Sequence, residues 1–254
     1  MENQYLSNIK KGLKVKIITN QNRIASGIID DVITKDSYQM YGIMVRLKTG
    51  EIGKVQQIIL SEEDKEKKNS EEVKKLIEKG ESFYNELKLS SLWSVNFTEE
   101  DIKKSKSMDL HYYKQKASKI IIAKSIASFL NSNGGSLIIG VRERKDSSEA
   151  EIIGVKDEFK KLKDPNKDGY KRMIIDEIIK PYFPFKISDH LNQYIYIDFI
   201  EINEKIICWI RIRRSESRVF LKLNDKEVFM IRTETENRCL EGEKLVDYCI
   251  KHFK

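Results

Sequence analysis

A helix, a glycine turn and a short apolar strand follow one another at 129–141, in the sequence FLNSNGGSLIIGV. The residues before this stretch repeat apolar side chains with a period of 3.6, which predicts a buried helical stripe. Gly134 and Gly135 favour a turn at the helix end, because glycine adopts positive φ at little cost. The apolar run 137–141 predicts a buried strand. This order constrains the fold most, since the helix leads directly into a central strand.

The same turn is not typical of a phosphate-binding loop. Such loops run from strand to helix, so that the helix N-terminus faces the anion. Here the glycines follow a helix, whose C-terminal end carries negative partial charge. Neither GxGxxG nor GxxxxGK[ST] is present. We therefore interpret the turn as structural and disfavour nucleotide binding there.

The charge balance favours a polyanionic partner. The 254 residues include 47 Lys and Arg against 40 Asp and Glu, a formal charge of +7. Nucleic acid is the first candidate for such a surface, and a generally lysine-rich surface is the alternative. Hydrophobic residues make up 40% of the chain, which is enough for a sizeable core in one or two domains.

Cysteine and histidine usage excludes several site classes. Cys208, Cys239 and Cys249 are odd in number and lack CxxC spacing, which favours a reducing compartment over a disulfide framework or a zinc site. Three scattered His residues disfavour Ser-His-Asp chemistry. The N-terminus lacks the apolar segment of a signal peptide, and no run approaches the roughly 20 apolar residues of a membrane span. We expect a cytoplasmic protein.

Residues 1–60 predict a small β-barrel, because short alternating strands are separated by glycine-containing turns. The pattern resembles the YwbE family of small bacterial and archaeal proteins over about residues 9–58. That resemblance implies an SH3/KOW-like barrel, and the family's usual His-Pro-His is Gln39-Met40-Tyr41 here. The residues that carry the resemblance are Gly12, Val15, Gly27, Ile28, Thr34, the run from Gly42 to Leu47, Gly50, Gly53 and Val55.

Basic residues of this barrel suggest either a nucleic-acid patch or ordinary solvated faces. The two interpretations have similar weight. The residues concerned are Lys10, Lys11, Lys14, Lys16, Arg46 and Lys54.

A polar segment marks the boundary after the barrel. Residues 61–69, SEEDKEKKN, contain no apolar side chain, so we predict a charged linker over 61–71. A helix is expected to begin at Ser70 as N-cap and to end at Gly80. The second domain is then expected over 72–254.

The second half of the chain resembles the Schlafen-type AlbA-like domain over about residues 72–245. The matching motifs are Glu-Ser-x-x-x-Glu-Leu-Lys at 81–88, the helix closing in NSNGG, SLIIGV, Ile153-Gly154-Val155, Pro181, the strand 206–213 and Phe229-Met230-Ile231-Arg232. The resemblance implies an α+β fold with a mixed sheet, and nucleic-acid binding. It also implies, in the nuclease branch of the family, a site of three carboxylates.

Carried over to this sequence, the implied site is Glu81, Glu86 and Glu143, with Glu143 at a position that is Asp in the nuclease branch. Such carboxylates could ligate Mg²⁺ or Mn²⁺ beside a phosphodiester. Lys88 lies two residues past Glu86, on the same strand face, and could offset negative charge in the transition state.

Spacing raises a difficulty for this site. Glu81 and Glu86 are five residues apart, so a continuous strand would point them to opposite faces. They can share an ion only if Glu81 lies outside the strand, in a bend near Gly80. The alternative is that both are surface carboxylates paired with lysines.

A basic strand supplies a candidate nucleic-acid surface. Over 206–213, apolar residues alternate with a face that ends in Trp209, Arg211 and Arg213. Arginine offers bidentate donors to phosphate, and tryptophan can stack on bases. A solvated strand end paired with acidic neighbours is the alternative. The full candidate set is Arg211, Arg213, Arg214, Arg218, Trp209 and Arg232.

These observations predict a nucleic-acid-binding protein, and RNA is favoured over DNA as its partner. The more specific expectation of structured RNA such as tRNA comes from the family resemblance alone. The leading hypothesis is a metal-dependent endoribonuclease that uses the three carboxylates. The alternative is a non-catalytic DNA- or RNA-binding regulatory module, and the third option is an ATP-binding protein. A homodimer is compatible with the sequence, which determines no oligomeric state.

Overall fold

The computed structural model describes residues 2–143 and 150–253. The chain divides into two compact units, Met1–Lys68 and Asn69–Lys254. Within the described ranges, every helix is too short or too polar to cross a bilayer.

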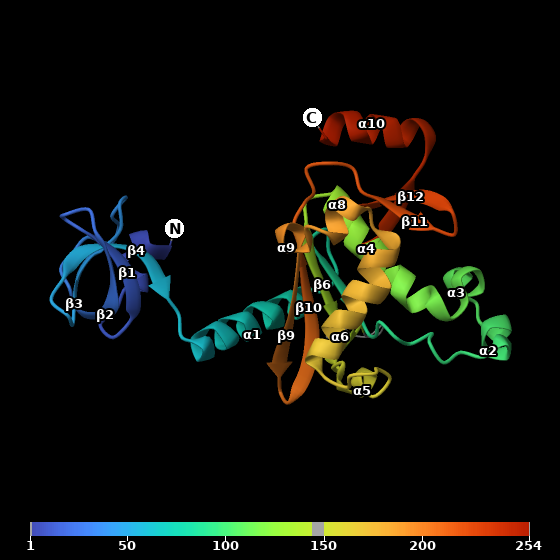
Figure 1. Ribbon diagram of the computed structural model, residues 1–254, viewed down its shortest axis with the longest axis horizontal. Helices are drawn as coiled ribbons and strands as arrows, with labels where there is room; N and C mark the ends of the chain where they lie inside the picture. The colour runs from blue at the N-terminus through green and yellow to red at the C-terminus, as the bar shows by residue number, and fades with distance from the viewer. Residues whose placement is uncertain (1, 144–149, 254) are drawn as a thin grey trace. The chain divides into compact units, whose positions relative to one another are not determined.

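The first unit is a closed four-stranded barrel (Figure 1). Along β1 the buried side chains Val15 and Ile17 alternate with exposed Lys14 and Lys16, as a strand with one face on the core requires. The predicted barrel is confirmed. Its strands are β1 (Lys14–Thr19), β2 (Ile24–Val32), β3 (Met44–Leu47) and β4 (Ile52–Ile59), each antiparallel to its neighbours.

The segment after the barrel is helical. Helix α1 spans Glu62–Lys79, so the prediction that a helix begins only at Ser70 is wrong. The Ser61 hydroxyl accepts a hydrogen bond from the backbone N–H of Asp64 at 3.1 Å, which caps the helix, and acidic residues fill its first turn. The helix ends before Gly80, which has φ +70°.

A mixed four-stranded sheet forms the centre of the second unit (Figure 1). Strand β5 is parallel to β6, whereas β6 is antiparallel to β10, and β10 is antiparallel to β9. The predicted α+β class with a mixed sheet is confirmed. The sheet order is β5 (Asn85–Lys88), β6 (Gly135–Ile139), β10 (Lys205–Ile212) and β9 (Ile195–Ile202).

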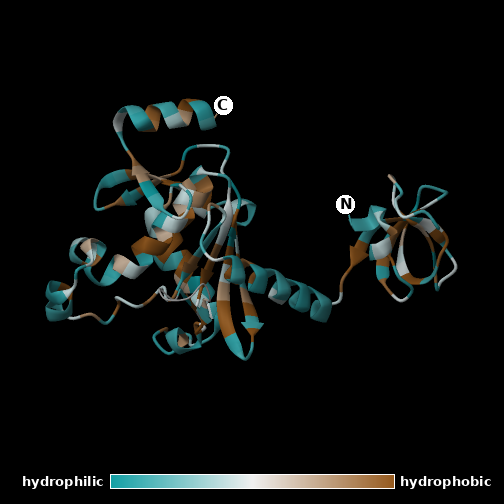
Figure 2. Ribbon diagram, turned by 180° about the vertical axis from the view of Figure 1, so that it is seen from behind, coloured by the Kyte–Doolittle hydropathy of each residue, from teal (hydrophilic) through white to brown (hydrophobic). Residues whose placement is uncertain are grey.

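Two apolar layers cover the two faces of this sheet. Helix α4 (Ala117–Asn131) packs Ile126 and Leu130 against one face. The second sheet, formed by β11 (Phe220–Leu223), β12 (Lys226–Arg232) and β13 (Asn237–Leu240), packs on the same cluster. On the other face, Val73 and Ile77 of α1 cover Trp209, while the rest of α1 is mostly hydrophilic (Figure 2).

The helix, turn and strand that opened the sequence analysis form as predicted. Gly134 has φ +74°, and a Cβ placed there would lie 2.6 Å from the carbonyl oxygen of Ile212. Only glycine therefore permits this close approach. The turn delivers the chain from α4 into β6 and packs directly against the end of β10.

A long helical segment of the second unit changes its helix type twice. Helix α6 (Lys167–Met173) continues as a π-helix over Ile174–Ile179 and then as α7 (Lys180–Tyr182). The helix therefore runs through Pro181 and ends after Tyr182, two residues before Pro184. Proline lacks an N–H donor, and the widened π-turn changes the hydrogen-bond pattern just before it.

The remaining elements surround this frame. Thr98 caps α2 with a capping box that includes Asp101, and Trp93 and Phe97 pack on a small apolar cluster. These elements are α2 (Glu99–Lys104), α3 (Met108–Tyr113), β7 (Val141–Arg142), β8 (Glu151–Ile152), α5 (Lys156–Phe159), α8 (Phe185–Ser188), α9 (Leu191–Tyr194) and α10 (Gly242–His252).

Candidate functional site

Glu86 is a carboxylate held inside the protein. It lies on β5 and is only 2% exposed. The side chain points towards Ser125 of α4. There its Oε1 atom accepts hydrogen bonds from the hydroxyl of Ser125 at 3.1 Å and from the amide of Asn237 at 3.0 Å.

Arg232 is the main partner of Glu86. Its guanidinium forms an ion pair with Glu86 Oε2 and donates to the backbone oxygens of Ser82 at 2.9 Å and Asn85 at 3.1 Å. Burial lowers the pKa of Arg232. Arg232 is 2% exposed, so the predicted contact with nucleic acid would require this side chain to leave the interior. It satisfies a buried charge instead, as desolvation of a carboxylate requires.

Lys88 lies between two carboxylates. Its Nζ atom is 2.7 Å from Glu86 Oε1 and 3.3 Å from Glu81 Oε1. Glu81 lies outside β5, directly after Gly80, which is the arrangement that the five-residue spacing demanded. Glu81 Oε1 also accepts from the backbone N–H of Leu87 at 3.2 Å. Glu81 and Glu86 therefore reach one ammonium group from different backbone positions.

Glu143 completes the group at the end of β7. Burial and the neighbouring charge of Glu81 raise the pKa of Glu143, while a hydrogen bond from the Glu81 backbone and the charge of Lys88 oppose this shift. The structure thus brings Glu143 close to Glu81 and Lys88. We call Glu81, Glu86, Lys88 and Glu143 the carboxylate cluster.

The carboxylate cluster has the donor chemistry of a magnesium site but not its arrangement. Hard oxygen ligands suit Mg²⁺ and Mn²⁺. Across residues 2–143 and 150–253, however, no three acidic, His or Cys side chains are placed to share an ion. Both oxygens of Glu86 are occupied by donors. As arranged, the cluster does not fit a bound divalent cation, and Lys88 supplies the positive charge.

The basic end of β10 carries a second group of interest. The guanidinium carbons of Arg211 and Arg213 lie over the ring of Tyr196, 5.8 Å and 5.1 Å from its centroid. Arg211 pairs with Asp198 at 2.5 Å. Within the described part of the chain, Arg213 has no carboxylate partner. We call Tyr196, Arg211 and Arg213 the arginine–tyrosine group.

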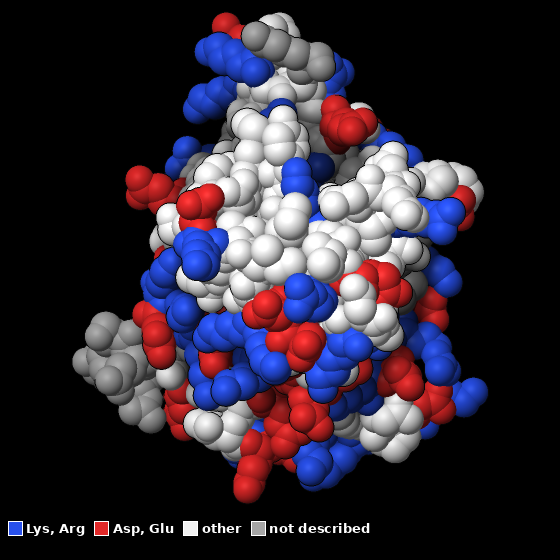
Figure 3. Space-filling model, turned by 90° about the vertical axis from the view of Figure 1, so that its left-hand side faces the viewer, with Lys and Arg blue, Asp and Glu red and all other residues white. Residues whose placement is uncertain are grey.

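The other residues predicted to contact nucleic acid differ in their exposure and in their partners. Trp209 is 1% exposed and donates its indole N–H to the Ser136 hydroxyl at 3.1 Å, so its ring would have to be uncovered before it could stack on a base. Arg214 donates to the backbone oxygen of His252. Arg218 is exposed. Charges of both signs are interspersed on the face in Figure 3 rather than gathered by sign.

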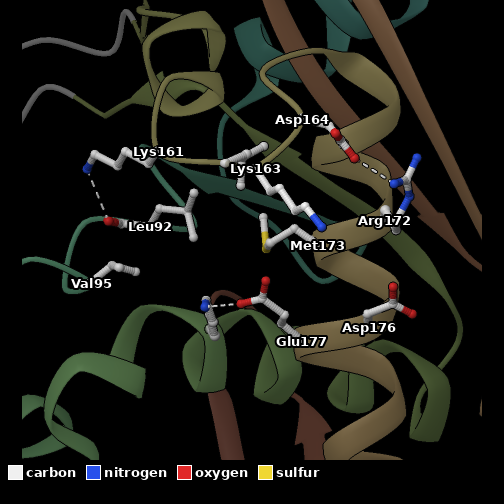
Figure 4. A pocket seen from close by; sticks show the side chains of 12 residues that line it. Leu92, Val95, Lys161, Lys163, Asp164, Arg172, Met173, Asp176 and Glu177 are labelled. Atoms are coloured by element: carbon white, nitrogen blue, oxygen red, sulfur yellow. Dashed lines mark hydrogen bonds and ion pairs between the residues drawn. The ribbon is translucent and has the colours of Figure 1, made fainter.

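A separate pocket of about 630 Å³ lies between α4 and α6 (Figure 4). Two of its four cations are paired with carboxylates: Arg172 with Asp164 at 2.6 Å, and Lys119 with Glu177. The side chain of Lys163 extends into the pocket (Figure 4). None of the predicted site residues lines it, and three carboxylates, Asp164, Asp176 and Glu177, offset most of the charge of its four cations.

Comparison with known proteins decides the family. A family model described as Schlafen, AlbA_2 matches residues 94–241. The chain belongs to the Schlafen AlbA_2 family. This membership indicates a nucleic-acid partner. The match begins after Glu81, Glu86 and Lys88, so of the carboxylate cluster it includes Glu143 alone.

The barrel has relatives of its own. A model for an uncharacterized conserved protein family, DUF2196, matches residues 2–58. The uncharacterized protein YwbE of Bacillus subtilis (strain 168) is 36% identical over 63 residues, which are 23% of this chain and 97% of that protein. The predicted resemblance of the N-terminal unit to YwbE is confirmed.

A solved structure resembles a larger part of the chain. The crystal structure of the DIP2311 protein from Corynebacterium diphtheriae aligns over 76% of this chain with 11% identity and a TM-score of 0.40. The chain spans 35% of that protein's length.

Sequence reasoning missed three polar partners of the site. Ser125, Asn237 and the backbone oxygen of Ser82 contact Glu86 or Arg232. A serine within the otherwise apolar stripe of α4 was an available signal, because a buried hydroxyl needs a hydrogen-bond partner. Asn237 gave no comparable signal, since it follows a polar turn.

Proposed function

We propose that the second unit binds structured RNA, such as tRNA, through the arginine–tyrosine group. The observation that carries this proposal is the pair of guanidinium groups over the ring of Tyr196, of which that of Arg213 has no carboxylate partner among the described residues. Guanidinium groups bind phosphate bidentately, and an aromatic ring offers a stacking surface. Family membership adds support for a nucleic-acid partner.

Binding without hydrolysis is favoured by the state of Glu86. Its two oxygens accept four donors, from Arg232, Lys88, Ser125 and Asn237. A carboxylate with so many partners has little capacity left for a metal ion. On this basis the carboxylate cluster stabilises the unit and places Lys88, which is 28% exposed in its side chain, near the surface.

A metal-dependent endoribonuclease is the second candidate. It is favoured by one observation: Glu81, Glu86 and Glu143 gather around a single lysine although Glu143 lies far along the sequence from the other two. Mg²⁺ or Mn²⁺ would have to replace Lys88 as the counter-charge of these groups. Hydrolysis of a phosphodiester bond is the chemistry that such an ion would support.

The binding proposal is tested with a labelled RNA hairpin by fluorescence anisotropy over a series of salt concentrations. We expect Arg213→Ala to weaken binding and to make the dependence of log K on log salt shallower by about 0.9 for a lost phosphate contact. Arg172→Ala is the matched control, because Arg172 is an exposed arginine paired with Asp164. Equal affinities of wild type and Arg213→Ala would refute the proposed surface.

Incubation of tRNA with the full chain and Mn²⁺ separates the two candidates. Binding without hydrolysis predicts intact tRNA at all times. Cleavage by wild type that is lost in Glu86→Gln would establish the nuclease instead. Cleavage that persists equally in Glu86→Gln would exclude the carboxylate cluster as its site.

A further inference from the structure

We propose that the barrel of the first unit binds unpaired nucleotides in the hollow beside Tyr41. This site lies in a different unit from the arginine–tyrosine group and does not rest on the function proposed for that group. The hollow measures about 370 Å³ and is lined by Asn3, Gln4, Ile18, Tyr41, Lys54 and Gln56, among others. Its volume is within the range of about 300–1,000 Å³ that is usual for small-ligand sites.

Positive charge is concentrated in the barrel. Residues 1–60 carry nine Lys and Arg against five Asp and Glu, a formal charge of +4 out of +7 for the whole chain. This segment is less than a quarter of the length. A polyanion is therefore attracted to the barrel more strongly, for its size, than to the rest of the chain.

Tyr41 presents an aromatic ring on a fixed loop. The residue is 71% exposed, yet the loop around it is tied down. Gln39 N–H donates to the Gln4 backbone oxygen at 2.8 Å, and Gln56 Nε2 donates to the Tyr41 backbone oxygen at 3.3 Å. A ring held in place before binding loses less entropy when it stacks on a base.

Gly42 explains why the loop lies so close to β4. It has φ +96°, and a Cβ placed there would lie 2.1 Å from the carbonyl oxygen of Val55. A side chain at this position would push Tyr41 away from the strand. The sequence Tyr41-Gly42 therefore sets the exposed ring against the floor of the hollow.

Lys54 places a cation beside the Tyr41 ring. Its Nζ atom lies 5.3 Å from the centroid of the Tyr41 ring. Within the described residues, neither Lys54 nor its outward-facing neighbours Lys16 and Arg46 forms an ion pair with a carboxylate. No acidic residue lines the hollow. The ammonium group is therefore available to a phosphate while a base stacks on the tyrosine.

These features fit unpaired nucleic acid better than an acidic peptide or a duplex. Stacking on an aromatic ring requires a base whose face is free, which a duplex does not offer. An acidic peptide would use Lys54 but not the ring. The amide side chains of Asn3 and Gln56 add polar groups beside the ring, as recognition of a base edge requires.

The test uses the full chain and fluorescein-labelled single strands of ten nucleotides, as RNA and as DNA, with a duplex of the same sequence. We expect single strands to bind more tightly than the duplex. We expect Tyr41→Ala to weaken single-strand binding about tenfold, as the loss of one stacked base implies, and Tyr41→Phe to retain it. The RNA and DNA arms show which sugar the hollow prefers.

Lys54→Ala is expected to make the salt dependence shallower by about 0.7 in log K against log salt. Tyr112→Ala is the control, since Tyr112 is 58% exposed and belongs to the second unit. Thermal melting of each variant verifies that the barrel is folded. Unchanged single-strand affinity in a folded Tyr41→Ala variant would overturn the proposal.

Photo-crosslinking with a 4-thiouridine strand separates this site from that of the second unit. We expect cross-links in the tryptic peptide 36–46, which contains Tyr41. Cross-links confined to residues of the second unit would overturn the barrel site and leave the function proposed for that unit intact. Cross-links confined to the barrel, together with hairpin binding that Arg213→Ala does not change, would support the barrel site and refute the function proposed for the second unit.

Discussion

Arg232 and Glu86 show how a pair of buried charges connects distant parts of the chain. They are separated by 146 residues, and their side chains are almost inaccessible to water. Neighbouring donors and acceptors from β5, α4 and β13 complete the network. Such a pair adds little to the net free energy of unfolding, whereas the loss of one partner is strongly destabilising because the other charge stays buried.

The first prediction concerns Arg232→Ala. We expect this change to lower the free energy of unfolding of the second unit by about 3–5 kcal/mol, because it removes the buried partner of Glu86 Oε2 and leaves only Lys88 as a cation beside that carboxylate. Urea denaturation followed by circular dichroism measures the change. The double variant Glu86→Gln/Arg232→Met should recover much of the loss, since it removes both charges. If it does not, the ion pair is not the cause.

The second prediction concerns Glu143 and pH. Its pKa is raised in the folded state by burial and by Glu81, so the folded state retains a proton longer than the unfolded state does. Stability therefore falls as pH rises through the interval above the ordinary glutamate pKa of about 4.3. We expect Glu143→Gln to have a higher Tm than wild type at pH 7.

Measurement of both Tm values at pH 7 and at pH 4 tests this expectation. The difference should shrink at pH 4, where Glu143 is largely protonated in wild type. A difference that stays constant over this range would show that the carboxylate charge is not responsible.

At the scale of elements, the glycine turn between α4 and β6 determines where the end of β10 lies. A Cβ placed on Gly134 would lie 2.6 Å from the carbonyl oxygen of Ile212 and 3.4 Å from Arg213 Cα. Any side chain at this position therefore displaces the end of the strand. The turn thus supports the position of one arginine in the arginine–tyrosine group.

The third prediction follows from this contact. Gly134→Ala should destabilise the second unit by more than about 1 kcal/mol, and it should weaken hairpin binding as Arg213 moves. Gly80→Ala is the matched control. Gly80 has a similar φ of +70° and no atom within 4 Å of a placed Cβ. It should lose stability through backbone strain alone and should keep its hairpin affinity.

Element prediction from the sequence succeeded where the apolar pattern was regular. The alternation of Val15 and Ile17 with lysines marked a strand, and the run into Gly134 marked the helix, turn and strand. Strand β13 was not predicted, because Asn237, Arg238 and Cys239 show no apolar alternation. Its pairing with β12 is a tertiary contact, which overrides local preference.

At the scale of the whole molecule, the site was only partly readable from the sequence. The resemblance suggested that Glu81, Glu86 and Glu143 converge, and the requirement that Glu81 lie outside the strand is met. The role of Arg232 was not readable. A strand-ending arginine is indistinguishable from a surface arginine until its partner, 146 residues away, is brought beside it.

The fourth prediction concerns the two units together. For a short single strand we expect Tyr41→Ala to weaken binding and Arg213→Ala to have no effect. For a hairpin we expect Arg213→Ala to weaken binding and Tyr41→Ala to have no effect. Anisotropy titrations of both ligands with both variants measure this pattern. Loss of both affinities in either variant would indicate one shared site instead of two.

The indole of Trp209 lies under the guanidinium carbon of Arg211, which is 4.5 Å from the ring, and the chain has only one other tryptophan, Trp93. A phosphate that draws Arg211 away alters the electric field at a buried fluorophore. The protein therefore carries its own optical reporter, and occupancy of the basic strand end can be followed from tryptophan emission without any added label.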